Sequence, residues 1–229
     1  MKTIGIIGGM SCESTRLYYD RLNAQARARL GGLHSAECVI WSVDFAEIEA
    51  LQAAGDWRAA GERLAAVARR LERAGAGLLI LATNTMHKVA PAIEAAVAIP
   101  LLHIADATAA AIRAAGLARP GLMATAYTME QTFYRGRLED AGLEPLIPDD
   151  ADRAATHRII YEELCKGVVR PESADAYRAI AARLVARGAD SLILGCTEVG
   201  MLLGPEDISV PVFDTTLIHA DRALEAALA

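Results

Sequence analysis

Several segments in the first half of this sequence resemble segments in the second half. The segment "GAGLLILATNT" (75–85) aligns without gaps with "GADSLILGCTE" (188–198), 113 residues further along the chain, and the alignment places Thr83 opposite Cys196. Two further pairs lie at nearly the same spacing, namely "IPLLHIAD" (99–106) with "VPVFDTTL" (210–217) and, more weakly, "GIIGGM" (5–10) with "GLMATA" (121–126). This common spacing predicts two similar halves of about 110 residues each.

In both halves, short apolar segments alternate with segments of helical periodicity. Stretches such as "WRAAGERLAAVARRLERAG" (57–75) and "SADAYRAIAARLVARG" (173–188) carry apolar residues three and four positions apart, which predicts amphipathic helices. The apolar segments lack alternation, as expected for parallel strands that helices cover on both faces, so the sequence predicts a parallel α/β fold. The expected strands are "TIGIIG" (3–8), "CVIWSVDF" (38–45), "LLILA" (78–82), "PLLHI" (100–104), "GLMAT" (121–125), "EPLIP" (144–148), "SLILG" (191–195) and "PVFDT" (211–215).

Two architectures fit eight strand–helix units. One is a TIM barrel, which usually needs about 250 residues, and the other is a pair of small sheets with pseudo-twofold symmetry. The repeat favours the pair of sheets, with one domain formed by residues 1–98 plus 210–229 and the other by residues 99–209. Both architectures place chemistry at the carboxyl ends of strands, but two related sheets can also bring Thr83 and Cys196 to one cleft.

Composition indicates a globular protein that acts on a small polar molecule. The 229 residues are 53% apolar with a net charge of -6, and they contain no cluster of Lys and Arg that would suggest a nucleic-acid partner. The chain has no signal-type segment and no apolar run of about 20 residues, so we expect a cytoplasmic protein without a membrane partner. The four cysteines are scattered and the histidines lack metal-binding spacings, so neither disulfides nor a metal site is predicted.

Cys196 is the first candidate for chemistry. It follows an apolar strand at the point where a helix is expected to begin, and the N–H groups of a helix N-terminus favour a thiolate. Asn84, Thr85 and Thr197 could donate hydrogen bonds to a ligand at the same strand ends. The alternatives are an inert buried cysteine and polar residues that cap helices.

The segment "GIIGGMSCEST" (5–15) and its counterpart "TAYT" (125–128) follow the first strand of each half. The first segment is rich in glycine but fits neither nucleotide-binding motif, so the glycines are expected to allow a sharp turn and close approach of a ligand beside Met10. By the repeat, Thr125, Tyr127 and Thr128 are expected to face the same cleft as Met10.

These residues resemble motifs of the aspartate/glutamate racemase family, the cofactor-independent amino-acid racemases. The resemblance covers nearly the whole chain and is carried by "KTIGIIGGMS", "ATNTMHK", "PLLHIADAT", "LGCTEVGMLL" and "PVFDTT", in the order of the family. It implies two pseudo-symmetric α/β domains, each a small parallel sheet flanked by helices, with the active site in the cleft between them. It also implies a homodimer, an amino-acid substrate and no cofactor, and it decides against the barrel.

The resemblance also assigns roles to single residues. Most such enzymes use two cysteines on opposite faces of the substrate; Cys196 matches the second, and Thr83 stands in place of the first, as in a branch specific for L-aspartate and L-glutamate. We therefore expect Cys196 to remove the Cα proton from the L form, and Thr83, or water that it holds, to complete protonation on the other face. Cys12 stands where members often have tryptophan. The implied substrate contacts are Met10, Gln52, Thr83, Asn84, Thr85, Cys196, Thr197 and Glu198.

Two alternatives stay open from the residues. One-cysteine chemistry on the same scaffold, such as that of an arylmalonate-type decarboxylase or a hydantoin racemase, would use Cys196 on a different substrate. An amino-acid-binding module without catalysis would keep the cleft but leave the Cα proton in place. Exchange of that proton with solvent distinguishes an enzyme from a binding module.

Overall fold

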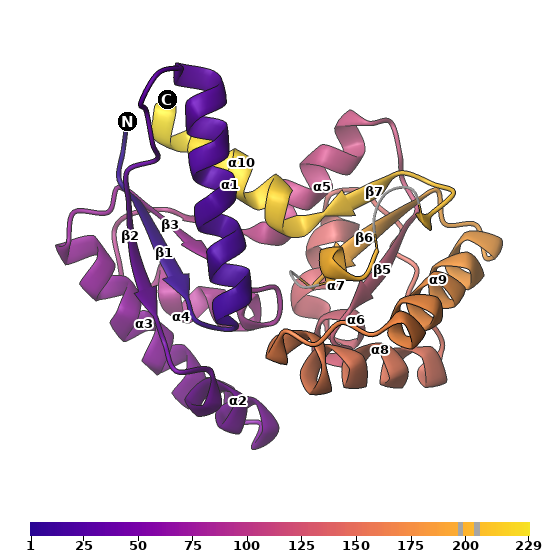
Figure 1. The fold of residues 1–229 in the computed structure, drawn as a ribbon. Coiled ribbons are helices and arrows are strands. Elements are labelled where there is room, and N and C mark those ends of the chain that lie inside the picture. The colour runs from indigo at the N-terminus through magenta and orange to yellow at the C-terminus, as the bar shows by residue number, and fades with distance from the viewer. Residues whose placement is uncertain (197–198, 204–206) are drawn as a thin grey trace. The chain divides into compact units, whose positions relative to one another are not determined.

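The computed structural model describes residues 1–196, 199–203 and 207–229. The chain forms two compact units, which we call unit 1 and unit 2. Unit 1 contains Met1–Ile104 and His219–Ala229, and unit 2 contains Ala105–Ile218. Figure 1 shows the helices and strands of both units.

Unit 1 is built on a parallel four-stranded sheet with the order β2-β1-β3-β4. The two central strands, β1 (Ile4–Gly8) and β3 (Leu78–Leu81), are buried along their whole length. The edge strands are β2 (Cys38–Ser42), which is only partly buried, and the short β4 (Leu101–Leu102). Continuous apolar sequence is therefore found where a strand has neighbours on both sides and helices on both faces.

Helices cover both faces of this sheet (Figure 1). Apolar residues of α1 (Cys12–Leu30) and of the final helix, α10 (Thr215–Leu228), pack with Ile6 and Ile80 on one face. On the other face, α3 (Trp57–Arg73) and α4 (Ala90–Glu94) pack with Ile7 and Leu81. Adjacent strand residues thus point into two separate cores, as the pleat of a strand requires. The unit also contains α2 (Phe45–Ala53) and the 3-10 helix η1 (Thr85–Val89).

Unit 2 contains a parallel three-stranded sheet with the order β5-β6-β7. Its strands are β5 (Pro120–Ala124), β6 (Ser191–Gly195) and β7 (Val212–Asp214). One core joins β6 to α8 (Asp150–Glu162) and α9 (Pro171–Ala186). The remaining elements are α5 (Ile104–Ala114), α6 (Ala126–Glu130), α7 (Thr132–Asp140), η2 (Leu164–Lys166) and η3 (Val199–Met201).

The two sheets share one strand order, which confirms the predicted fold class of two parallel sheets flanked by helices. The order β1-β3-β4 in unit 1 matches β5-β6-β7 in unit 2. The strand predicted at 144–148 is reduced to a single parallel bridge between Leu146 and Gly121, at the place where β2 pairs in unit 1. The architecture is therefore not a closed barrel of eight strands.

The boundaries between the units differ from those predicted. Residues 99–104, expected in the second domain, include β4, which pairs with β3 and so belongs to unit 1. Residues 210–218, expected with the first domain, include β7, which pairs with β6 in unit 2. Strand pairing sets both boundaries, because each short strand completes the sheet of the half that precedes it in sequence.

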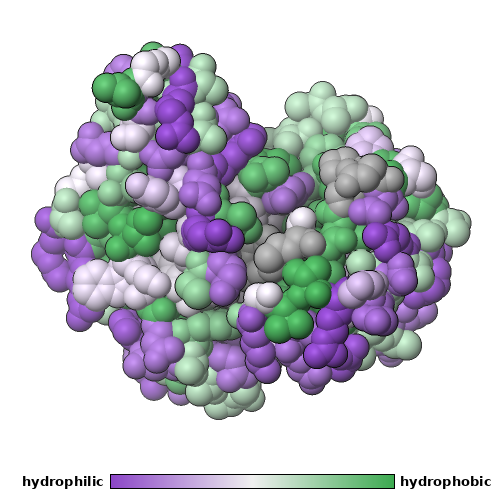
Figure 2. Space-filling view, in the orientation of Figure 1, coloured by the Kyte–Doolittle hydropathy of each residue, from purple (hydrophilic) through white to green (hydrophobic). Residues whose placement is uncertain are grey.

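Large apolar side chains fill the cores on both faces of the sheet in unit 1 and the core of unit 2. Large apolar side chains that remain exposed are Met1, Tyr19, Leu30, Leu33, Ile40, Val168, Val169 and Leu217. On the face drawn in Figure 2, hydrophilic and hydrophobic residues are interspersed. No helix in the described part of the chain is long and apolar enough to cross a membrane.

Candidate active site

The turn after β1 is shaped by two glycines. Gly9 adopts a φ of 89°, and a Cβ atom there would lie 2.2 Å from the carbonyl oxygen of Val43, so only glycine fits this close approach. The N–H of Gly9 donates to the Thr15 hydroxyl at 2.8 Å. Met10 follows with its side chain 4% exposed, packed in the core on the α3 side of the sheet. The glycines therefore provide the expected sharp turn, but Met10 is largely a core residue.

Hydroxyl groups connect this turn to the end of β3. Ser11 caps α1 by accepting from the N–H of Ser14 at 3.2 Å. The hydroxyl of Ser14 in turn donates to the carbonyl of Ala82 at 2.9 Å. The carboxyl ends of β1 and β3 are thereby fixed side by side.

The end of β3 carries three of the predicted site residues. Thr83, Asn84 and Thr85 are buried, with Thr83 8% exposed. Asn84 precedes η1 but its side chain makes no capping hydrogen bond to that helix, so the capping alternative does not account for it. Gln52, also buried, donates from its amide to the sulfur of Met86, one residue beyond Thr85. Unit 1 therefore gathers these polar side chains around one strand end.

Three buried histidines lie beside the end of β3. The ring of His87 is 4.4 Å from that of His103 and 5.8 Å from that of His219, measured between centroids. His219 is 0% exposed, and burial lowers its pKa to about 4. Tyr18 donates to Nδ1 of His219 at 2.8 Å, and Nε2 of His219 donates to the carbonyl of Leu102 at 2.9 Å. Since a carbonyl only accepts, His219 is neutral with its proton on Nε2.

In unit 2, the residues after β5 form a short cap. Thr125 accepts from the N–H of Thr128 at 3.3 Å and begins α6, and both threonines are buried. Tyr127 is half-buried, and its ring lies 5.6 Å from that of His157 on α8. Capping, the frequent role of threonine, therefore accounts for part of the pattern that suggested ligand binding at Thr125.

His157 is a residue that the sequence did not single out. Its Nδ1 accepts from the N–H of Ala126 at 3.3 Å, and its ring packs 4.7 Å from that of Tyr161. Burial is the main cause that lowers its pKa, and Glu130 opposes this effect. Because Ala126 lies 31 residues before His157 in the chain, no local sequence pattern announces this contact.

Cys196 lies directly after β6 and is 8% exposed. Its carbonyl accepts from the N–H of Val199 at 3.1 Å. The next element that the structure describes is η3, a 3-10 helix of 3 residues. The expectation that a helix begins at Cys196 and favours a thiolate falls on residues outside those described, and it stays a prediction. The predicted contacts Thr197 and Glu198 lie outside the described residues.

The other cysteines are free thiols in different settings. Cys38 and Cys165 are half-buried, and Cys12 is exposed. The thiol of Cys12 donates to the carboxylate of Glu13 at 3.2 Å, and this bond is the first cause that raises its pKa. A raised pKa disfavours the thiolate, so Cys12 is a poor nucleophile compared with an activated cysteine.

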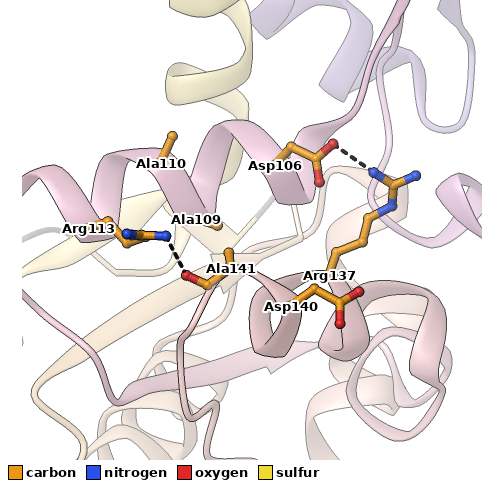
Figure 3. Close-up of a pocket in the computed structure, with 7 residues that line it drawn as sticks. All are labelled: Asp106, Ala109, Ala110, Arg113, Arg137, Asp140 and Ala141. Carbon is orange, nitrogen blue, oxygen red and sulfur yellow. Dashed lines mark hydrogen bonds and ion pairs between the residues drawn. The ribbon is translucent and has the colours of Figure 1, made fainter.

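A cavity of about 800 Å³ lies between α5 and α7 of unit 2, and its described lining residues include none of the predicted site residues (Figure 3). Two arginines and two aspartates line it together with alanines. Arg137 pairs with Asp106 at 2.6 Å, and Arg113 donates to the carbonyl of Ala141 at 2.8 Å. These arginines are thus engaged within the protein. Across the described ranges, no group of three or more His, Cys, Asp or Glu side chains is arranged to hold a metal ion.

The comparison with protein-family models identifies one family. The profile of the Asp/Glu/hydantoin racemase family matches residues 7–223. A crystal structure from Yersinia pestis, provisionally described as an Asp/Glu racemase, is 55% identical with a TM-score of 0.93, and 100% of each chain is covered. An aspartate racemase homologue from Pyrococcus horikoshii OT3 is 36% identical with a TM-score of 0.86, again with 100% of both chains covered.

A curated relative has an activity in its name. The broad specificity amino-acid racemase RacX of Bacillus subtilis is 23% identical over 163 residues, which cover 70% of this chain and 69% of that protein.

Proposed function

Because the chain belongs to the Asp/Glu/hydantoin racemase family and is thus an isomerase, we propose that it racemises an acidic amino acid, aspartate or glutamate, with Cys196 and Thr83 on opposite faces of Cα. The reaction breaks the Cα–H bond on one face and forms a Cα–H bond on the other. It therefore needs one group that accepts a proton and one that donates a proton, and no redox partner. We propose that the side chains of this protein supply both without a cofactor.

The observation that carries the proposal is the equivalence of Thr83 and Cys196. They stand just beyond β3 and β6, which occupy the same place in the strand order of the two units. Each is 8% exposed, although the strands before them are buried throughout. Chemically competent side chains at matching strand ends are what a reaction on two faces of one carbon requires.

The two proposed groups are unequal. A thiol has a reference pKa of about 8.5, so a fraction is thiolate near neutral pH, whereas an aliphatic hydroxyl has no accessible ionised form without activation. We therefore assign proton removal from the L form to Cys196. The electron pair stays on the substrate until Thr83, or water that Thr83 holds, donates a proton to the opposite face.

The remaining predicted residues are proposed as substrate contacts. Hydrogen bonds from such groups stabilise the charge that develops when the Cα proton leaves, and positioning contributes further to the rate. In unit 1 the polar groups cluster at the end of β3, and in unit 2 they follow β5 and β6. The proposed contacts are Met10, Gln52, Asn84, Thr85, Thr125, Tyr127, Thr128, Thr197 and Glu198.

A chiral assay tests the reaction and the substrate together. The purified protein is incubated in D2O with L- and D-aspartate, L- and D-glutamate and several neutral amino acids, and both enantiomers and Cα deuterium are measured. We expect conversion of an acidic amino acid, with unequal deuterium uptake from its two enantiomers. Equal uptake from both would refute the assignment of unequal faces, and uptake from none of the amino acids would refute the function.

Substitutions test the assigned residues. Cys196→Ala should lower turnover by roughly 1,000-fold or more, because the proton acceptor is lost. Thr83→Ala should lower turnover less, and Thr83→Cys should raise the rate from the D form above that of the alanine variant. The matched control is Cys38→Ala, which removes a half-buried thiol from β2 and should leave turnover unchanged. Substantial turnover in Cys196→Ala would show that another group removes the proton.

A further inference from the structure

The main chain of Thr83 is held on both sides. Its N–H donates to the carbonyl of Leu81 at 2.8 Å. Its carbonyl lies 2.8 Å from Nδ1 of His87, and since a carbonyl oxygen only accepts, Nδ1 must carry the proton. The backbone of Thr83 is thus fixed by one main-chain contact and one imidazole.

The second nitrogen of His87 is also engaged by the main chain. The N–H of Ile104 donates to Nε2 at 3.3 Å, so Nε2 must be unprotonated. The two contacts together define a neutral imidazole with its proton on Nδ1. His87 is 1% exposed and packs against the rings of His103 and His219, which leaves it little room to turn. The ring therefore bridges the end of β3 to the start of α5.

The equivalent strand end in unit 2 uses a different device. Extending the repeat by two residues places Gly200 opposite His87. A glycine has no side chain, so this position cannot supply an imidazole. The carbonyl of Cys196 instead accepts from the backbone N–H of Val199. A Cβ on Gly200 would lie 3.1 Å from a carboxylate oxygen of Asp214, so a side chain at this position would have to displace that carboxylate slightly. The imidazole clamp is therefore specific to the strand end that carries the hydroxyl.

We propose that His87 is a positioning residue for racemisation, which acts by fixing the main chain of Thr83. This inference rests on the proposed function. A hydroxyl donates a proton less readily than a thiol, so it depends more strongly on its placement, and a displacement of about 1 Å can slow a reaction by roughly 100-fold. His87 holds the backbone from which the Thr83 side chain projects, and neither of its nitrogens is available to the substrate.

Two substitutions separate the two contacts of His87. In His87→Asn, the side-chain amide takes the place of Nδ1 and can still donate to the carbonyl of Thr83. In His87→Gln, the longer side chain places its amide near the position of Nε2, so it can accept from Ile104 but no longer holds Thr83. The two variants have similar polarity, and each keeps one of the two hydrogen bonds.

The readout is a ratio of two rates in D2O. With L-aspartate or L-glutamate as substrate, one rate is formation of the D form and the other is uptake of deuterium into the remaining L form. Uptake without inversion needs Cys196 alone, whereas inversion also needs the face of Thr83. Loss of folded protein lowers both rates equally and leaves the ratio unchanged, so the ratio isolates positioning from stability.

We expect the ratio of inversion to uptake to fall by roughly 10-fold or more in His87→Gln and to stay within about 2-fold of the native value in His87→Asn. His219→Gln serves as a control, because it changes a buried histidine of the same group that does not contact Thr83. An unchanged ratio in His87→Gln, or an equal fall in the Asn and control variants, would overturn the role of His87. Absence of deuterium uptake by the native protein would instead overturn the proposed function.

Discussion

Acidification from pH 7 to pH 4 should destabilise the folded protein through His219. This histidine is 0% exposed, and both of its nitrogens are engaged, one by Tyr18 and one by the carbonyl of Leu102. Among the described residues, two titratable rings pack against it, Tyr18 on α1 and His87 on η1. Burial lowers the pKa of His219 to about 4, and the hydrogen bond to Leu102 opposes this only in part.

The sign and size of the effect follow from this pKa. A histidine in the unfolded chain has a pKa of about 6.5. Above that pH both states are neutral and the stability is fully present, while between pH 6.5 and 4 only the unfolded state takes up the proton. The free energy of unfolding therefore falls by about 1.4 kcal/mol per pH unit, or roughly 3 kcal/mol by pH 4. This is a large part of a typical total of 5–15 kcal/mol.

Urea unfolding at half-unit steps from pH 7.5 to pH 4, on native protein and on His219→Gln, measures the effect. The glutamine amide can donate to Leu102 in place of Nε2 but does not titrate. It loses the contact with Tyr18, which should lower stability by about 1 kcal/mol at every pH. We expect the variant to be the less stable protein at pH 7 and the more stable one at pH 4. Titrating groups that the two proteins share contribute equally to both curves, so any difference in pH dependence belongs to His219. Parallel stability curves for the two proteins would therefore refute the reasoning.

Two further outcomes are expected. Gly8→Ala should lower the free energy of unfolding by about 1–3 kcal/mol, since the new Cβ would lie 2.6 Å from Cγ2 and Oγ1 of Thr15. Gly136→Ala in α7 is the control, because a Cβ there meets no neighbouring side chain within 4 Å. It should leave the free energy of unfolding unchanged or raise it by up to about 1 kcal/mol. Urea denaturation of both variants at pH 7 checks this pair. Dialysis against EDTA should leave turnover unchanged, as measured by the chiral assay before and after; loss of turnover that Zn²⁺ or Mg²⁺ restores would contradict a metal-free reaction.

The sequence predicted the strands well because each is a local apolar run. The repeat even carried the strand order, since its three paired segments became β1 and β5, β3 and β6, and β4 and β7. The repeat could also have set the boundaries between the units. If β4 pairs with β3 in one half, the matching segment β7 should pair with β6 in the other. Assigning 210–229 to the first domain ignored this: β7 pairs with β6, and only the helix that follows it contributes to unit 1.

The positions of candidate residues at strand ends could be predicted from the sequence, whereas contacts with residues far along the chain could not. Thr83 and Cys196 could be located because they directly follow apolar strands. The role of His87 could not, because one of its partners, Ile104, lies 17 residues away.

The different anchoring of the two strand ends has a chemical consequence if they act as a pair. A thiol has an accessible ionised form, unlike an aliphatic hydroxyl, so Cys196 should depend less on exact placement, and a backbone hydrogen bond from Val199 holds its main chain. Thr83 has no such ionised form, and it stands at the end that a buried imidazole clamps at 2.8 Å. A cysteine at position 83 should depend less on this clamp. In a Thr83→Cys background, His87→Gln should therefore lower inversion by a smaller factor than in the native background, and equal factors in the two backgrounds would separate the clamp from the chemistry of the hydroxyl.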